Sequence, residues 1–217
     1  MNIEPFSIED IPSFLELAAA ERWVAEIWEF DFLLAAFPQG CFRARDEADN
    51  AVGFVTSLRH DSSGWIGNLI VGKESRARGI GRELFLRALA ALRESGTETI
   101  WLTASKSGKP LYEKHGFSGI DTIIRWTGSG NGLAVAAPCG AGAVDGNLDR
   151  LGWGDKRDKL LAIINERGSA LAANGAFAIV QPCGGADQIG PFASMTAQDS
   201  ALLLDAAISG ISWGKKI

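Results

Sequence analysis

One feature constrains the fold of this chain more than any other. It is a strand followed directly by a glycine- and arginine-rich loop and then by a helix. Residues 65–71 are apolar and rich in β-branched side chains, and this pattern predicts a buried strand. Beyond the loop 76–82, apolar residues recur with the period of a helix, and Gly96 ends that pattern. These apolar positions are Ile80, Leu84, Ala88 and Leu92. The sequence therefore predicts a strand, a loop and a helix N-terminus in direct succession.

The loop Arg76-Ala77-Arg78-Gly79-Ile80-Gly81-Arg82 has the chemistry of an anion site. Gly79 and Gly81 lack Cβ, so a ligand can approach the backbone amides closely. The first amides of a helix have no partner within the helix, and the helix dipole makes their surroundings positive. Arginine adds forked donors that suit phosphate oxygens. The loop therefore favours a pyrophosphate, although its spacing fits neither a Walker loop nor a dinucleotide fingerprint.

This segment resembles motif A of the GNAT superfamily of acyl-CoA-dependent N-acyltransferases, because Arg76-x-x-Gly79-x-Gly81 fits the family's Gln/Arg-x-x-Gly-x-Gly/Ala loop. The resemblance implies that acetyl-CoA or coenzyme A is the cofactor and that the loop holds its pyrophosphate. The cofactor-binding positions that it implies are Leu69, Ile70, Val71, Arg76, Ala77, Arg78, Gly79, Ile80, Gly81, Arg82, Ser105, Gly108 and Tyr112.

A second stretch, residues 105–117, resembles motif B of the same superfamily through Leu111, Tyr112, Gly116 and Phe117. Ser105 stands where the family usually has Asn, and Gly108 stands where it usually has Ala. The resemblance makes Tyr112 the catalytic acid that protonates the leaving thiolate, and a phenol is protonated at neutral pH. The alternative is a core tyrosine whose hydroxyl is satisfied by the backbone.

The order of predicted elements is that of the GNAT fold, an α/β fold with a mixed sheet. Residues 1–127 form the predicted N-acetyltransferase domain. Its predicted strands are 2–6, 41–45, 51–58, 65–71, 97–104 and 120–127. Its predicted helices begin at residues 11, 22 and 80, and a further helix is predicted between the last two strands. The resemblance implies that the strands ending near Val71 and Ala104 are parallel neighbours that splay apart and leave room for the pantetheine arm.

The sequence identifies the acceptor amine and the general base less closely than it identifies the cofactor. The first 50 residues hold eleven acidic and three basic residues. Glu26 and Glu29 are candidates to attract a cationic amine, and the alternative is a solvated acidic helix face. The central strand carries Asn68 but no carboxylate, so the base stays open. A water relayed by an acidic residue or by His60 is one route.

The composition of the chain changes after residue 127. Residues 128–147 contain six glycines and one charged residue, which predicts a linker. Residues 148–217 resemble a degenerate C-terminal GNAT-like domain, a second and smaller α/β half-domain, with strands at 177–182 and 188–192 and a helix at 197–208. Because no pyrophosphate loop follows the second of these strands, no cofactor site is expected there. An exposed sheet edge makes a homodimer a reasonable hypothesis.

The overall composition excludes several classes of protein. A net charge of −5 argues against nucleic-acid binding. The sequence shows neither a signal peptide nor an apolar run long enough for a membrane. Three widely spaced cysteines indicate a reduced, cytoplasmic protein without a metal site.

The predicted function is transfer of an acetyl group from acetyl-CoA to a primary amine of a small molecule, peptide or protein, by direct attack in a ternary complex. A catalytically inactive coenzyme A binding or sensor module and a pure interaction protein are the alternatives.

Overall fold

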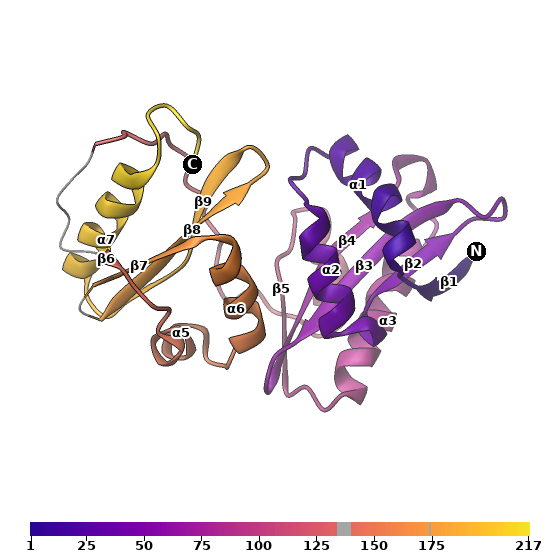
Figure 1. Cartoon of the computed structure of the whole chain (residues 1–217). Coiled ribbons are helices and arrows are strands. Elements are labelled where there is room, and N and C mark those ends of the chain that lie inside the picture. The colour runs from indigo at the N-terminus through magenta and orange to yellow at the C-terminus, as the bar shows by residue number, and fades with distance from the viewer. Residues whose placement is uncertain (134–139, 174) are drawn as a thin grey trace. The chain divides into compact units, whose positions relative to one another are not determined.

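The computed structural model describes residues 1–133, 140–173 and 175–217, which fall into two compact units, Met1–Ile124 and Arg125–Ile217 (Figure 1). Part of the predicted linker, including Cys139, lies outside the described residues.

The first unit is a five-stranded mixed sheet with helices on both faces. Its elements are β1 (Asn2–Pro5), α1 (Ile11–Ala20), α2 (Ile27–Ala36), β2 (Phe42–Arg45), β3 (Ala51–Arg59), β4 (Ser63–Val71), α3 (Ile80–Glu94), β5 (Thr99–Leu102) and α4 (Lys109–Glu113). The strands lie in chain order; β1 to β4 pair antiparallel, and β4 pairs with β5 in parallel. The predicted α/β class and the predicted order through α4 are confirmed.

Two apolar cores lie on opposite faces of this sheet (Figure 1). One joins the sheet to α3 and includes Val55, Ile66 and Leu84. The other joins it to α1 and α2 and includes Phe54 and Ile70. Neighbouring strand residues point to opposite faces, so Phe54 and Val55 belong to different cores as the pleat requires.

A β-bulge in β4 explains why Ile66 and Ile70 also belong to different cores. Residues four apart in a regular strand share a face, but the pairing with β3 shifts register between Phe54 and Thr56, so two residues of β4 lie opposite Val55. Asn68, at this bulge, has a left-handed backbone with φ 52°. The extra residue reverses the faces of the last part of β4.

The start of the second helix differs from the prediction. The helix begins at Ile27 rather than at residue 22, because α1 ends in a Schellman motif that continues past residue 22. Arg22 has φ 60° and donates to the Ala19 carbonyl, and the Trp23 amide donates to the Ala18 carbonyl at 2.9 Å. This motif satisfies the last carbonyls of α1 and turns the chain out of the helix.

The predicted strand at 120–127 is wrong, because these residues join no sheet. Ile120 and Trp126 are 74% and 85% exposed, and the first unit ends within the segment at Ile124. The β-branched composition is that of a strand, but a strand also needs a hydrogen-bonded neighbour, and tertiary structure does not provide one here.

The second unit repeats the topology of the first from β1 to α3. Its elements are β6 (Gly140–Ala141), α5 (Gly146–Trp153), α6 (Asp158–Arg167), β7 (Ser169–Ala173), β8 (Ala176–Cys183), β9 (Ala186–Ser194) and α7 (Ala197–Gly210). They form an antiparallel sheet in the order β6-β7-β8-β9. The β8–β9 pairing shifts register between Ala178 and Val180, which is the counterpart of the β4 bulge. The predicted strands at 177–182 and 188–192 and the helix at 197–208 are confirmed.

Part of the predicted linker is packed in this unit. Gly128 and Ile217 exchange backbone hydrogen bonds at 3.2 and 3.0 Å, and Gly130 donates to the Lys215 carbonyl at 2.8 Å. Ser129 forms a bridge with Lys216. The glycines allow this close approach, since a Cβ at position 130 would lie 2.5 Å from the Ser212 carbonyl oxygen.

A buried carboxylate ties the turn before α1 to β2 of the first sheet. Asp10 is 6% exposed at its side chain and accepts hydrogen bonds from the Ser7 amide (2.9 Å), the Ser7 hydroxyl (2.7 Å) and Arg43. Burial raises the pKa of Asp10, but the hydrogen bonds from Ser7 and Arg43 outweigh it, so the pKa lies below its ordinary value.

We expect Asp10→Asn to lower the free energy of unfolding by about 2–3 kcal/mol at neutral pH, because the substitution breaks a largely buried ion pair. A carboxylate with a lowered pKa stabilises the fold above the unfolded-state pKa, and this contribution is lost as the pH falls through the folded-state pKa. The difference between variant and wild type in urea unfolding should therefore shrink in acid. Asp61→Asn, in an exposed turn, is the control; an equal loss there would contradict the assignment.

Candidate functional site

The last residues of β4 lie beside a gap in the first sheet. β5 pairs with β4 only where Thr99–Leu102 run beside residues 63–66. Residues 67–71 pair with β3 and have no strand on their other side among the described residues. The predicted parallel pair with a splayed end is therefore present. Leu69 and Val71 pack toward α3, whereas Ile70 packs toward α1 and α2.

Six successive backbone amides follow this strand end and lack a protein acceptor. Within the described ranges, the amides of residues 77–82 make no hydrogen bond to backbone or side chain, and the first helical bond runs from the Glu83 amide to the Gly79 carbonyl at 3.1 Å. Ala77 and Gly79 have φ of 62° and 82°, so the chain turns sharply before α3. Unbonded amides at the positive end of a 15-residue helix favour an anion.

The two glycines of the loop leave free space for different reasons. Gly79 is the N-cap of α3 and has a left-handed backbone that disfavours a side chain. Gly81 lies within the helix, and a Cβ there would meet only Val71 Cγ2 at an ordinary 3.5 Å. Protein packing therefore does not require a small residue at position 81, whereas a ligand close to the amides would.

The three arginines of the loop have different surroundings. Arg76 donates from Nε to the Val71 carbonyl at 2.9 Å and from its terminal nitrogen to Glu21 at 2.8 Å. Arg82 pairs with Glu83 at 2.7 Å. Arg78 is exposed and has no ion pair within the described part of the chain. Only Arg78 therefore has a guanidinium that no carboxylate neutralises.

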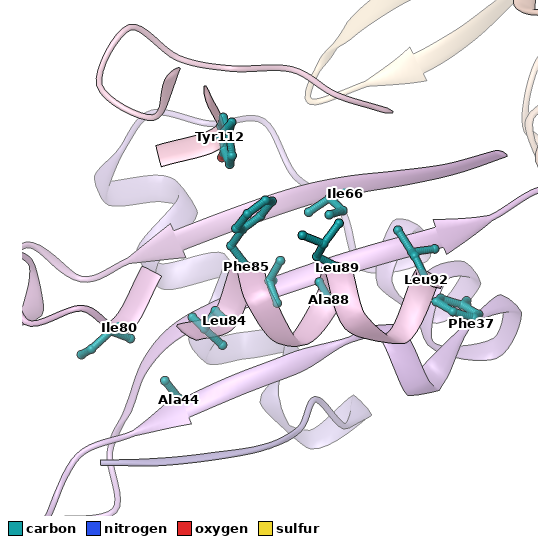
Figure 2. Packing of buried hydrophobic residues seen from close by; sticks show 11 residues of the cluster. Phe37, Ala44, Ile66, Ile80, Leu84, Phe85, Ala88, Leu89, Leu92 and Tyr112 are labelled. Carbon is teal, nitrogen blue, oxygen red and sulfur yellow. The ribbon is translucent and has the colours of Figure 1, made fainter. Parts of the chain in front are cut away.

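Tyr112 lies on α4 with its ring in the core on the α3 side (Figure 2). Its ring meets that of Phe85 edge-on at a centroid distance of 5.2 Å. Its hydroxyl makes no hydrogen bond with any described residue, so the backbone partner of the alternative interpretation is not found. Burial raises the pKa of the phenol, which keeps it protonated through neutral pH.

Ser105 and Gly108 form the turn that begins α4 beneath Tyr112. The Ser105 hydroxyl accepts from the amide of Gly108, the N-cap residue of α4, at 3.1 Å, so its oxygen closes the turn before the short helix. A Cβ at position 108 would lie 3.2 Å from both Ser105 Oγ and Tyr112 Cε2, and 3.5 Å from the Tyr112 hydroxyl. Glycine at this position keeps the surroundings of the phenol open.

The acidic candidates lie at the start of α2. Glu26 is the N-cap residue and accepts from the Trp28 indole at 2.8 Å, and Glu29 lies in the first turn. An acidic residue that contacts the loop is Glu21, which sequence reasoning missed. Its position after a helix carried no signal, because its contact with Arg76 joins residues 55 apart in the sequence.

No group of three or more potential metal ligands occurs in residues 1–133, 140–173 and 175–217. Over the same ranges, no helix has the length and apolar character needed to cross a membrane.

Comparisons with known proteins agree with this geometry. The profile of the acetyltransferase (GNAT) family matches residues 7–117. N-alpha-acetyltransferase MAK3 of Arabidopsis thaliana is 35% identical over 97 residues, 42% of this chain and 51% of that protein. The chain thus spans about half the length of this curated relative.

A solved structure shares the fold. The crystal structure of a proposed acetyltransferase from Pyrococcus horikoshii has a TM-score of 0.79 and 23% identity, with 100% of this chain and 78% of that chain covered. Glucosamine-6-phosphate N-acetyltransferase from Arabidopsis thaliana has a TM-score of 0.48 and 18% identity, with 58% of this chain and 96% of that chain covered. The first likeness shows a common fold across both units.

Tyr112 is the only tyrosine of the chain, so its ionisation can be measured directly. We expect the phenolate absorbance of the native protein to appear at higher pH than that of the unfolded chain, because burial disfavours the charged form. Ultraviolet titration with and without denaturant measures both values. Coincident titrations would contradict the buried position of the ring.

Proposed function

Because the chain belongs to the acetyltransferase (GNAT) family, we propose that it transfers an acetyl group from acetyl-CoA to the primary amine of a small molecule, peptide or protein. The run of unbonded amides at residues 77–82, at the start of α3 and beside the open end of β4, carries this proposal. These amides and Arg78 would hold the pyrophosphate of coenzyme A. The exposed edge of β4 near Leu69 and Val71 would pair with the pantetheine arm.

The proposed reaction is direct attack in a ternary complex. The nitrogen of a neutral amine forms a bond to the thioester carbonyl carbon, and the carbon–sulfur bond then breaks. The departing thiolate takes the proton of Tyr112, whose hydroxyl has no other described partner. The proton that the amine nitrogen loses passes to water, and water returns a proton to Tyr112, so the net proton count balances. Asn68 at the bulge of β4 cannot take this proton, because an amide is not basic.

A peptide α-amine is the acceptor that we favour. The matched relative is an N-alpha-acetyltransferase, and the family match includes the α1–α2 region, where Glu26 and Glu29 lie. These two carboxylates would attract a cationic amine before it loses its proton.

A coenzyme A binding module without catalysis is the alternative function. Asn68, in place of a carboxylate on β4, favours it, whereas Tyr112 with an unengaged hydroxyl favours catalysis. Release of free thiol from acetyl-CoA, in the presence of a panel of peptides, polyamines and amino sugars, separates the two. Coenzyme binding without acceptor-dependent thiol release would support the alternative.

We also propose that Arg125–Ile217 is a degenerate copy of the GNAT half-fold, because it repeats the order of elements and the bulge. β9 has no further strand on its outer side among the described residues, and this edge supports the hypothesis of a homodimer. Light scattering at micromolar concentration would test it. The widely spaced cysteines support a cytoplasmic location.

We expect Gly81→Leu to weaken coenzyme A binding at least tenfold in calorimetry while the melting temperature changes little. The bulky side chain would occupy space beside the amides that the ligand needs, whereas leucine favours a helix over glycine by about 1 kcal/mol. Gly152→Leu, within α5 and with no atom near the added Cβ, is the matched control. Unchanged coenzyme affinity in Gly81→Leu would contradict a ligand at these amides.

We expect Tyr112→Phe to lower kcat roughly 100-fold or more, the usual contribution of a general acid, with coenzyme affinity nearly unchanged. The phenyl ring preserves the packing against Phe85, so the fold should be retained. Steady-state thiol release with a reactive acceptor measures the effect. Equal turnover in variant and wild type would reject the acid role.

A further inference from the structure

The contacts of Arg76 do not fit a phosphate ligand. Its Nε donates to the carbonyl of Val71, the last residue of β4, and its terminal nitrogen pairs with Glu21 after the end of α1. Lys73 lies just before the loop, and its Nζ is 3.8 Å from the same carboxylate oxygen of Glu21. The guanidinium thus joins the strand end to α1, and Glu21 already compensates its charge.

The negative charge of Glu21 would oppose binding of an anion at the loop 76–82. The proposed function places a diphosphate at this loop, and a nearby carboxylate repels it. If Glu21 acted only through its charge, the site would bind anions better without it. The presence of Glu21 is explained if it favours anion binding, by fixing the position of the loop, more than its charge opposes binding.

We propose that Glu21 is a positioning residue for the cofactor loop: it holds Arg76, and Arg76 holds the loop against the end of β4, so that the amides of residues 77–82 face one anion. This inference rests on the proposed function. In this proposal Arg76 does not bind the phosphates but acts as a tether, which links the loop to Glu21. Arg78 is then the arginine that would contact the phosphates.

The end of α1 is built to hold Glu21 in place. Glu21 is the C-cap residue of α1, and its amide donates to the carbonyls of Leu17 (3.2 Å) and Ala18 (3.1 Å). The Schellman motif at Arg22 and Trp23 fixes the backbone directly after it. Glu21 therefore starts from a rigid backbone, which limits the entropy lost when its side chain holds Arg76.

The loop itself needs such support. It contains two residues with left-handed backbones, Ala77 and Gly79, and its six last amides gain nothing from protein hydrogen bonds. The Arg76 contacts are the side-chain bonds that join the loop to Val71 and to α1. Without Glu21, the guanidinium would be free to leave the Val71 carbonyl, and the amides would lose their common orientation.

The test compares Glu21→Gln with Glu16→Gln in coenzyme A calorimetry. Both variants remove one negative charge from α1, but Glu16 is exposed and has no ion pair within the described residues. We expect Glu21→Gln to weaken binding about tenfold, as for the loss of one charged hydrogen bond. Glu16→Gln should stay within about twofold of wild type, because its charge is screened by solvent. The melting temperatures should agree, because an exposed ion pair adds little to stability.

Equal or tighter binding in Glu21→Gln would overturn the inference, because it would show that the carboxylate acts only through its charge. Wild-type protein that does not bind coenzyme A would instead refute the proposed function, so the two failures are distinguishable.

A double variant adds a readout that a merely structural role would not give. If Glu21 and Arg76 act as one unit, Glu21→Gln combined with Arg76→Gln should be little worse than Arg76→Gln alone. The effect of Arg78→Gln should add to that of Glu21→Gln, because Arg78 acts separately. Additive effects of Glu21→Gln and Arg76→Gln would contradict the tether.

Discussion

The proposed chemistry of the first unit depends above all on backbone amides to which the protein offers no acceptor. Backbone amides without a protein acceptor are satisfied by water or by a ligand, and the first four amides of any helix lack a partner within the helix. Here six of them follow one another at the positive end of α3, with Arg78 nearby. The sheet, the cores and the tether through Arg76 hold this run in place.

The two units share a bulged strand followed by a helix, but they differ in the connection between the strand and the helix. Residues 72–79 separate β4 from α3, and the run of unbonded amides begins among them at Ala77, whereas only residues 195 and 196 separate β9 from α7. There the Thr196 hydroxyl caps the Asp199 amide, and Asp199 adds negative charge. The start of α7 therefore has a side-chain acceptor for one of its amides and a carboxylate in its first turn, so it favours an anion less than the start of α3 does.

The sequence predicted the parts of the site that local pattern controls. The apolar strand, the Gly/Arg loop and the periodic helix follow from residues close together in the chain, and the structure contains all three. The contact of Glu21 with Arg76 and the absence of a strand at 120–127 could not be predicted, because both depend on neighbours distant in the sequence. The strand β7 was missed because Ser169–Ala173 consists mainly of alanine, which has little strand propensity.

Amide NMR spectra of the ¹⁵N-labelled chain, recorded during addition of coenzyme A, test the central claim most directly. Hydrogen bonding to a diphosphate should shift the amide signals of residues 77–82 more than any others, and the signals at the start of α7 should stay in place. Binding that leaves the signals of residues 77–82 unmoved, or that shifts mainly the second unit, would contradict the account.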